Sequence, residues 1–265
     1  MRIVFPKWDA SRPWVMSVPG DQRQDVPDHS DILVAMTPQA ALRVDDDHRV
    51  LVVSGTPSDE HGENASAHAQ AGDLGAYWLA RRDGQWIVTA RRDSLMWTGV
   101  SGSVGTVTAV ELGKGHPAVV LVGGSCWQGF CGDWLSMIGF DDHGSITLVK
   151  GQMLDSSSIS AFLDCDDRLS GTSSEADAAS AADDDEAARP SLNADNCFDI
   201  AGTWHLQPRR GAGHADLVLV YTGRDLAPDP RTGALVGRAI SESLVLRYDG
   251  GVYSTVSGRD PTHTL

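Results

Sequence analysis

The sequence predicts an all-β fold in which antiparallel β-meanders repeat along the chain and stack on one another in the manner of a β-propeller. Three observations predict it. The 28 glycines and 12 prolines favour many turns over long helices. Short apolar runs alternate with tight-turn signals, and one sequence pattern recurs along the chain. A β-sandwich whose strands resemble each other by chance is the alternative.

The repeat is clearest in segments 105–124 and 202–223. Both begin with Gly-Thr, pass through Gly-x-Gly-His, and continue into an apolar Val-Leu-Val run. The histidines of this motif are His116 and His214. A weaker copy covers residues 42–55, with His48 in the matching place. This recurrence predicts that one supersecondary unit is used several times.

A pair of strands joined by a tight turn is expected after each copy. Asp83-Gly84, His143-Gly144 and Asp249-Gly250-Gly251 lie between apolar runs, and Asp-Gly favours hairpins because the primed turns require positive φ. The unit is therefore a meander of three or four strands. Because a lone meander cannot bury its apolar face, the copies must stack, and the apolar runs 119–122 and 217–220 predict inner strands that are covered on both faces.

Four cysteines allow three disulfide connectivities. Local pairing, Cys126–Cys131 and Cys165–Cys197, would close the short loop CWQGFC and clamp a polar insert. A zinc site is a rival, but CxxC-like pairs and nearby histidines are missing, and free buried thiols of a cytosolic protein are the third reading. Two disulfides imply an oxidising compartment, so we expect a periplasmic protein. The N-terminal residues lack the pattern of a signal peptide, which we expect to be absent from this sequence.

Residues 166–196 are small, acidic and nearly free of large apolar side chains. Such a segment buries too little apolar surface to offset its ordering entropy, so we expect a disordered or mobile insert. A short helix over residues 175–188 would lack a convincing apolar face. The chain as a whole, residues 1–265, is predicted to form a single repeat-built β domain that carries this insert.

The net charge of −15 restricts the partners of the protein. Binding of phosphates requires a basic surface, so nucleic acid and anionic membrane surfaces are poor partners. No membrane span is expected, because no window approaches about 18 uninterrupted apolar residues. The acidic surface would attract a basic protein partner, or it serves only to keep the protein soluble.

The sequence predicts no catalytic residues, metal site or cofactor. Metalloprotease, P-loop and dinucleotide-binding motifs are missing. Segment 99–105 only approximates the G-x-S-x-G elbow of serine hydrolases, and it precedes a strand. Acidic clusters at 45–47, 141–142 and 164–167 offer oxygen ligands for calcium, but none has the spacing of a calcium loop, and we interpret them as solvated turns.

The repeat histidines are also interpreted as structural residues. His48, His116 and His214 occupy equivalent positions in successive units, so we expect them to lie far apart. We expect each to make a structural hydrogen bond at the start of a strand.

Aromatic residues mark a candidate interface. The chain has eight tryptophans beside five phenylalanines and four tyrosines. Trp127 lies inside the CWQGFC loop with Phe130, and Trp134 follows closely. Exposed aromatic side chains on a constrained loop are typical anchors of protein interfaces. Alternatively, these rings fill gaps between stacked units.

The Gly-x-Gly-His and Val-Leu-Val pattern, followed by a strand and an Asp-Gly turn, resembles degenerate propeller repeats of the FG-GAP and VCBS kind, although it lacks their calcium-loop aspartates. Over residues 42–258 the architecture is similar to that of bacterial periplasmic, propeller-like inhibitors, which include I-type lysozyme inhibitors and immunity proteins against peptidoglycan hydrolases. Members of that group insert a loop into the cleft of the hydrolase. The resemblance implies that Ser101-Gly102-Ser103 or Ser257-Gly258-Arg259-Asp260 has this role, although neither has the aromatic residue that ends the loop of the lysozyme inhibitors.

We therefore expect a periplasmic inhibitor or immunity protein that occludes a basic secreted bacterial toxin, such as a cell-wall hydrolase. A carbohydrate-binding or hydrolytic propeller is the second hypothesis, and it requires a central or top-face pocket with convergent carboxylates and a stacking tryptophan. The third is a scaffold or adhesion module. The candidate partner-binding residues are Trp127, Phe130, Trp134, Ser101, Ser103, Arg259 and Asp260.

Overall fold

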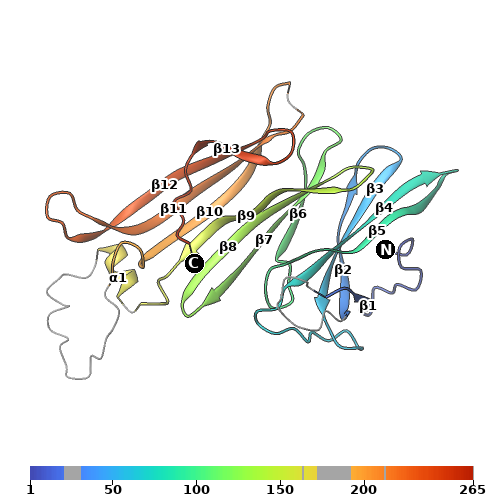
Figure 1. Cartoon of the computed structure of the whole chain (residues 1–265), viewed down its shortest axis with the longest axis horizontal. Coiled ribbons are helices and arrows are strands. Elements are labelled where there is room, and N and C mark those ends of the chain that lie inside the picture. Colours follow the sequence, from blue (N-terminus) through green and yellow to red (C-terminus); the bar gives the residue numbers. More distant parts are fainter. Residues whose placement is uncertain (21–30, 163, 172–191, 212, 265) are drawn as a thin grey trace.

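The computed structural model describes residues 1–20, 31–162, 164–171, 192–211 and 213–264. These residues form two antiparallel sheets, with five strands in one and eight in the other (Figure 1). Within each sheet, strands that follow one another in the chain pair with each other. The predicted all-β class is therefore confirmed. The elements are β1 (Trp14–Val18), β2 (Ile32–Arg43), β3 (His48–Pro57), β4 (Gly72–Arg82), β5 (Gln85–Thr98), β6 (Thr106–Glu111), β7 (Pro117–Trp127), β8 (Phe130–Phe140), β9 (Ser145–Ser157), α1 (Cys165–Ser170), β10 (Phe198–Gln207), β11 (Asp216–Pro228), β12 (Leu235–Tyr248) and β13 (Tyr253–Gly258).

The strands follow the predicted repeat as three meanders of four strands each. Unit 1 comprises β2–β5, unit 2 comprises β6–β9, and unit 3 comprises β10–β13, while β1 is added at the edge of unit 1. The repeat histidine begins the second strand in unit 1 and lies between the first two strands in units 2 and 3, and in each unit the predicted tight turn joins the last two strands. Units 2 and 3 share one sheet, although only two residue pairs join β9 to β10.

The tight turns have local causes that the sequence contains. Asp83 and Gly84 have φ values of 51° and 77°, as a primed hairpin turn requires. The Asp141 carboxylate accepts hydrogen bonds from the backbone N–H groups of His143 and Gly144. The carboxylate of Asp249 closes the turn of unit 3 in the same way. These aspartates stabilise turns, as aspartate commonly does.

Strand β7 is covered on both faces, as its apolar run predicts. Val119 and Leu121 are buried against unit 1, whereas the alternating residues Ala118 and Val120 are buried against unit 3. The same prediction holds only in part for β11. Its odd-numbered residues are buried against unit 2, and Val218 on the other face is also buried, but Val220 on that face is 37% exposed, because unit 3 is the last meander of the stack.

Both predicted disulfides are present, Cys126–Cys131 and Cys165–Cys197. The second joins α1 to the start of β10, and it packs with Leu169 and Leu226 in a small apolar cluster. The expected insert begins with ordered structure, since α1 reaches Ser170. Residues 172–191, including the possible helix at 175–188, lie outside the described residues. Among the described residues, no helix is long and apolar enough to cross a membrane.

Candidate functional site

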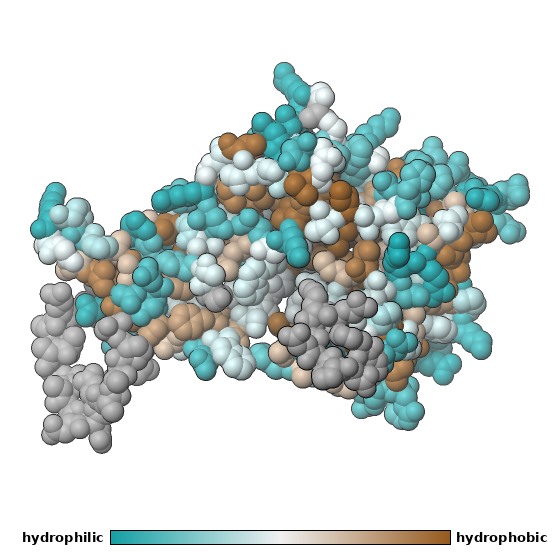
Figure 2. Space-filling view, viewed as in Figure 1, coloured by the Kyte–Doolittle hydropathy of each residue, from teal (hydrophilic) through white to brown (hydrophobic). Residues whose placement is uncertain are grey.

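A pocket of about 570 Å³ lies where loops from the three units meet. The connections between the first two strands of the units contribute Val44, His116 and His214, the β8–β9 turn contributes residues 141–144, and β12 contributes Tyr248. We call it the three-loop pocket. In the space-filling view, hydrophobic residues gather between the two sheets, below the hydrophilic loops at the top of the view (Figure 2).

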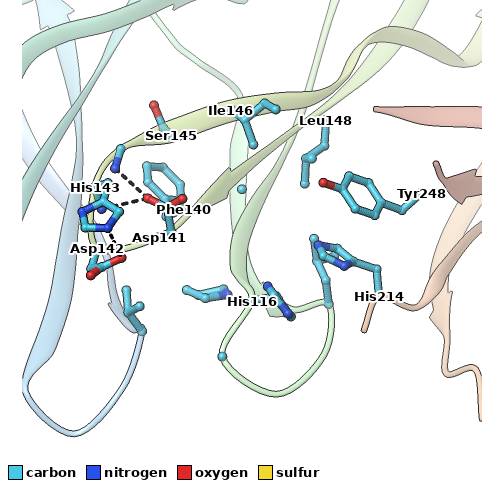
Figure 3. Close-up of a pocket in the computed structure, with 16 residues that line it drawn as sticks. His116, Phe140, Asp141, Asp142, His143, Ser145, Ile146, Leu148, His214 and Tyr248 are labelled. Atoms are coloured by element: carbon cyan, nitrogen blue, oxygen red, sulfur yellow. Dashed lines mark hydrogen bonds and ion pairs between the residues drawn. The ribbon is translucent and has the colours of Figure 1, made fainter. Parts of the chain in front are cut away.

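The labelled polar side chains of the three-loop pocket form two groups. His116, His214 and Tyr248 lie on one side, and the β8–β9 turn with Asp142 and His143 lies on the other (Figure 3). Buried apolar residues also line it, namely Leu112, Phe140 and Leu148. Trp78 of unit 1 fixes the turn, because its indole N–H donates a hydrogen bond of 2.8 Å to the carbonyl of Asp141.

Two of the repeat histidines meet in this pocket, so the expectation that all three lie far apart is wrong. The ring centroids of His116 and His214 are 4.4 Å apart, and the ring of Tyr248 stacks on His214 at 4.0 Å. The loops themselves touch, since the Ala215 N–H donates a hydrogen bond of 2.6 Å to the carbonyl of Leu112. Units 2 and 3 share a curled sheet, and its curvature brings their first loops together.

The motif glycines permit this contact. A Cβ atom at Gly113 would lie 1.8 Å from the carbonyl oxygen of Gly213, so only glycine fits there without displacing the other loop. The Gly-x-Gly-His motif is thus a packing motif between neighbouring units.

His48 differs from the other repeat histidines because of the residue three positions before it. That residue is Asp45, and its carboxylate lies 2.9 Å from Nδ1 of His48. The matching positions before His116 and His214 hold glycine. Among the described residues, the side chains of these two histidines make no hydrogen bond to the protein. The predicted structural hydrogen bond is therefore present at His48 and wrong for the other two.

The electrostatic character of the pocket is neutral to negative. Burial, and then the neighbouring charge of His116, lower the pKa of His214 below its usual 6.5, so this imidazole is neutral at pH 7. The ring of His143 lies 3.5 Å from the Asp142 carboxylate. No lysine or arginine is among the described residues that line the pocket.

The CWQGFC segment forms a two-residue hairpin at the opposite end of β7. Cys126 pairs with Cys131 across the strands, and the turn residues Gln128 and Gly129 both have positive φ. Trp127 is 65% exposed at this tip. The other aromatic candidates are less accessible, because Phe130 packs edge-on against Phe162 and Trp134 is half-buried in β8.

The serine candidates lie beside this tip. The Trp127 ring stacks on the ring of His68, with centroids 6.5 Å apart, and Nδ1 of His68 lies 3.4 Å from Oγ of Ser101. In the same loop, Oγ of Ser103 accepts a hydrogen bond from the Gly105 N–H. We call Trp127, His68, Ser101 and Ser103 the Trp127 surface. His68 has no sequence signature that would have identified it.

The remaining candidates, Arg259 and Asp260, are engaged within the protein. The Arg259 guanidinium donates to Glu242 at 2.6 Å, and Asp260 accepts a hydrogen bond of 2.6 Å from the side-chain amide of Gln152. The ring of His263 then stacks on Phe198 at 4.1 Å. The C-terminal segment is therefore held against the eight-stranded sheet, near β9 and β10.

Among the described residues, no group of three or more histidine, cysteine, aspartate or glutamate side chains is placed to hold a metal ion. Comparison of the chain with models of protein families, with curated proteins and with solved structures found no match. The function must therefore be argued from the two surfaces described above.

Proposed function

We propose that this protein is an extracytoplasmic binding protein that inhibits a secreted bacterial toxin, namely a basic cell-wall hydrolase, through the Trp127 surface. One observation carries the proposal, namely that a 65% exposed tryptophan stands at the tip of a disulfide-closed hairpin. Large exposed aromatic side chains are rare on surfaces without a partner, and tryptophan is enriched among the residues that dominate binding energy.

The neighbourhood of Trp127 supports a role in binding. The Cys126–Cys131 disulfide and the two-residue turn restrict the hairpin before any partner binds, so little conformational entropy remains to be lost on association. The adjacent Ser101–Ser103 loop offers hydroxyl and backbone groups at the rim. The net charge of −15 favours encounter with a basic partner, and the two disulfides are compatible with a location outside the cytoplasm.

Inhibition of peptidoglycan hydrolysis tests the proposal. The purified protein is added to a panel of basic peptidoglycan hydrolases, including the product of any toxin-like gene adjacent to its own, and clearing of a cell-wall suspension is followed. We expect inhibition of at least one of them. Trp127→Ala should weaken it by about 30-fold, as expected for loss of a dominant anchor.

The matched control is Val236→Ala, since Val236 is another exposed apolar residue, 44% exposed on β12. This variant should inhibit like the unmodified protein. The proposal fails if no hydrolase is bound or inhibited, or if Trp127→Ala and Val236→Ala inhibit equally well.

A further inference from the structure

The three-loop pocket is spatially distinct from the Trp127 surface. Its His116 precedes β7 directly, whereas Trp127 ends the same strand, so the two sites lie at opposite ends of an eleven-residue strand. We propose that the three-loop pocket binds an uncharged sugar or short oligosaccharide.

The size and placement of the pocket suit a small ligand. Its volume of about 570 Å³ lies within the range of roughly 300–1,000 Å³ that is typical of ligand sites. Three loops and one turn, each from a different part of the chain, converge on it. Such convergence between packed elements is a common origin of ligand sites.

Polar edges with no internal partner face this space. The ring of Tyr248 stacks on that of His214, and the ring of His116 lies tilted against His214, so these rings contact one another and polar edges remain for a ligand. In the described part of the chain, the imidazole nitrogens of both histidines and the hydroxyl of Tyr248 make no hydrogen bond. Figure 3 shows that this hydroxyl points toward the interior of the pocket. Neutral imidazole supplies one donor and one acceptor, and a phenol supplies both.

The remaining lining fits the apolar face of a sugar ring. Ile146 is 49% exposed although it is a large apolar residue, and it lines the pocket with the buried side chains of Leu112 and Leu148. Ser145 adds a hydroxyl and Asp142 a carboxylate at the rim. The pocket therefore combines hydrogen-bond donors and acceptors with an apolar wall. A sugar ring has the matching chemistry, because its hydroxyl groups surround a face made of C–H groups.

The charge of the lining decides against an anionic ligand. No lysine or arginine lies among the described lining residues, while Asp141 and Asp142 are both present. A phosphate or a uronic acid would meet negative charge with no compensating cation. An uncharged sugar avoids this repulsion.

Titration with defined oligosaccharides tests the proposal. Neutral di-, tri- and tetrasaccharides of glucose and of N-acetylglucosamine are titrated into the full-length protein, and binding is measured by calorimetry and by NMR. We expect at least one to bind with a dissociation constant of millimolar or below, and an oligomer of uronic acid to bind at least about tenfold more weakly. Tyr248→Phe and His214→Ala should each weaken binding by about tenfold, the loss expected for one hydrogen bond to a ligand.

The controls come from the repeat itself. His48→Ala removes the equivalent histidine, which pairs with Asp45 and does not line the pocket, so sugar binding should be unchanged. Tyr248→Phe retains the ring that stacks on His214, which keeps the test valid if His214→Ala fails to fold. The proposal is overturned if no neutral sugar binds at millimolar concentration, if Tyr248→Phe binds as tightly as the unmodified protein, or if the uronic acid oligomer binds equally well.

Discussion

Glycine at position 113 lets loops from two different meanders touch. We predict that Gly113→Ala lowers the free energy of unfolding by about 2 kcal/mol, the usual cost of forcing extra atoms into a packed contact, because its new Cβ would lie 1.8 Å from the Gly213 carbonyl oxygen. Urea unfolding followed by tryptophan fluorescence measures this change.

The matched control for this substitution is Gly251→Ala. Gly251 also lies in a turn, but a Cβ there has open space around it and its φ is not positive. We expect its effect to stay within about 0.5 kcal/mol, as for most surface substitutions. Equal stabilities for the two variants would show that the contact between the loops contributes nothing.

The Gly-x-Gly-His motif could be identified from the sequence, but its role in packing could not. The residue three positions before each histidine decides the role of that histidine, since Asp45 binds His48 while glycine leaves the rings of His116 and His214 free to contact each other. The identity of Asp45 is visible in the sequence. The partner of Gly113 is not, because Gly213 belongs to another meander and only the curvature of the shared sheet brings it close.

At the scale of elements, the local features were predictable and the convergent ones were not. The hairpin at Asp83-Gly84 follows from the φ values that these residues tolerate, and the four-stranded unit follows from the repeat. The three-loop pocket depends on loops separated by long stretches of chain, so no periodic pattern in the sequence predicts it. The apolar run of β11 predicted cover on both faces, yet a strand's sequence does not reveal that its unit is the last in the stack.

The contact between the first loops of units 2 and 3 should respond to pH. The pKa of His214 is lowered from 6.5, chiefly by burial and then by His116. Below pH 6.5 the unfolded chain therefore takes up a proton more readily than the folded one, so the stability that neutral His214 contributes is present above pH 6.5 and is lost as pH falls through the folded pKa.

NMR titration of the histidine ring protons checks this prediction. We expect His214 to titrate below 6.5 in the unmodified protein and closer to 6.5 in His116→Ala, because that change removes both the neighbouring charge and part of the burial. A His214 pKa at or above 6.5 in the unmodified protein would contradict the stacked arrangement.

For the whole molecule, the two disulfides should differ in their contribution to stability. Cys165 and Cys197 are separated by 32 residues, whereas Cys126 and Cys131 are separated by five. A disulfide restricts the unfolded chain more when it closes a longer loop. Replacing Cys165 and Cys197 by alanine should therefore cost about 3–4 kcal/mol, and replacing Cys126 and Cys131 by alanine should cost about 2 kcal/mol. Denaturant unfolding of both double variants measures the difference, and an equal loss for the two would contradict an entropic origin.

The three units should unfold together, because unit 2 is packed on both sides. Leu121 is buried between units 1 and 2, and Leu219 is buried between units 2 and 3. Replacing either with alanine should cost about 2–5 kcal/mol, whereas Val236→Ala, at an exposed position, should cost little. Five of the eight tryptophans pack in or against unit 1, whereas unit 3 contains one, Trp204. Tryptophan fluorescence therefore reports mostly on unit 1, and far-UV circular dichroism reports on every strand.

A stack that shares its cores cannot lose one interface without weakening the next. We therefore expect the fluorescence and circular dichroism transitions of Leu219→Ala to shift to lower urea by the same amount, even though the cavity lies in the interface farther from the unit 1 tryptophans. If circular dichroism shows an early partial loss while the fluorescence midpoint stays unchanged, unit 3 unfolds independently. In that case the repeat is a chain of separate modules, and the three-loop pocket, which needs loops from all three units, would exist only while unit 3 stays docked.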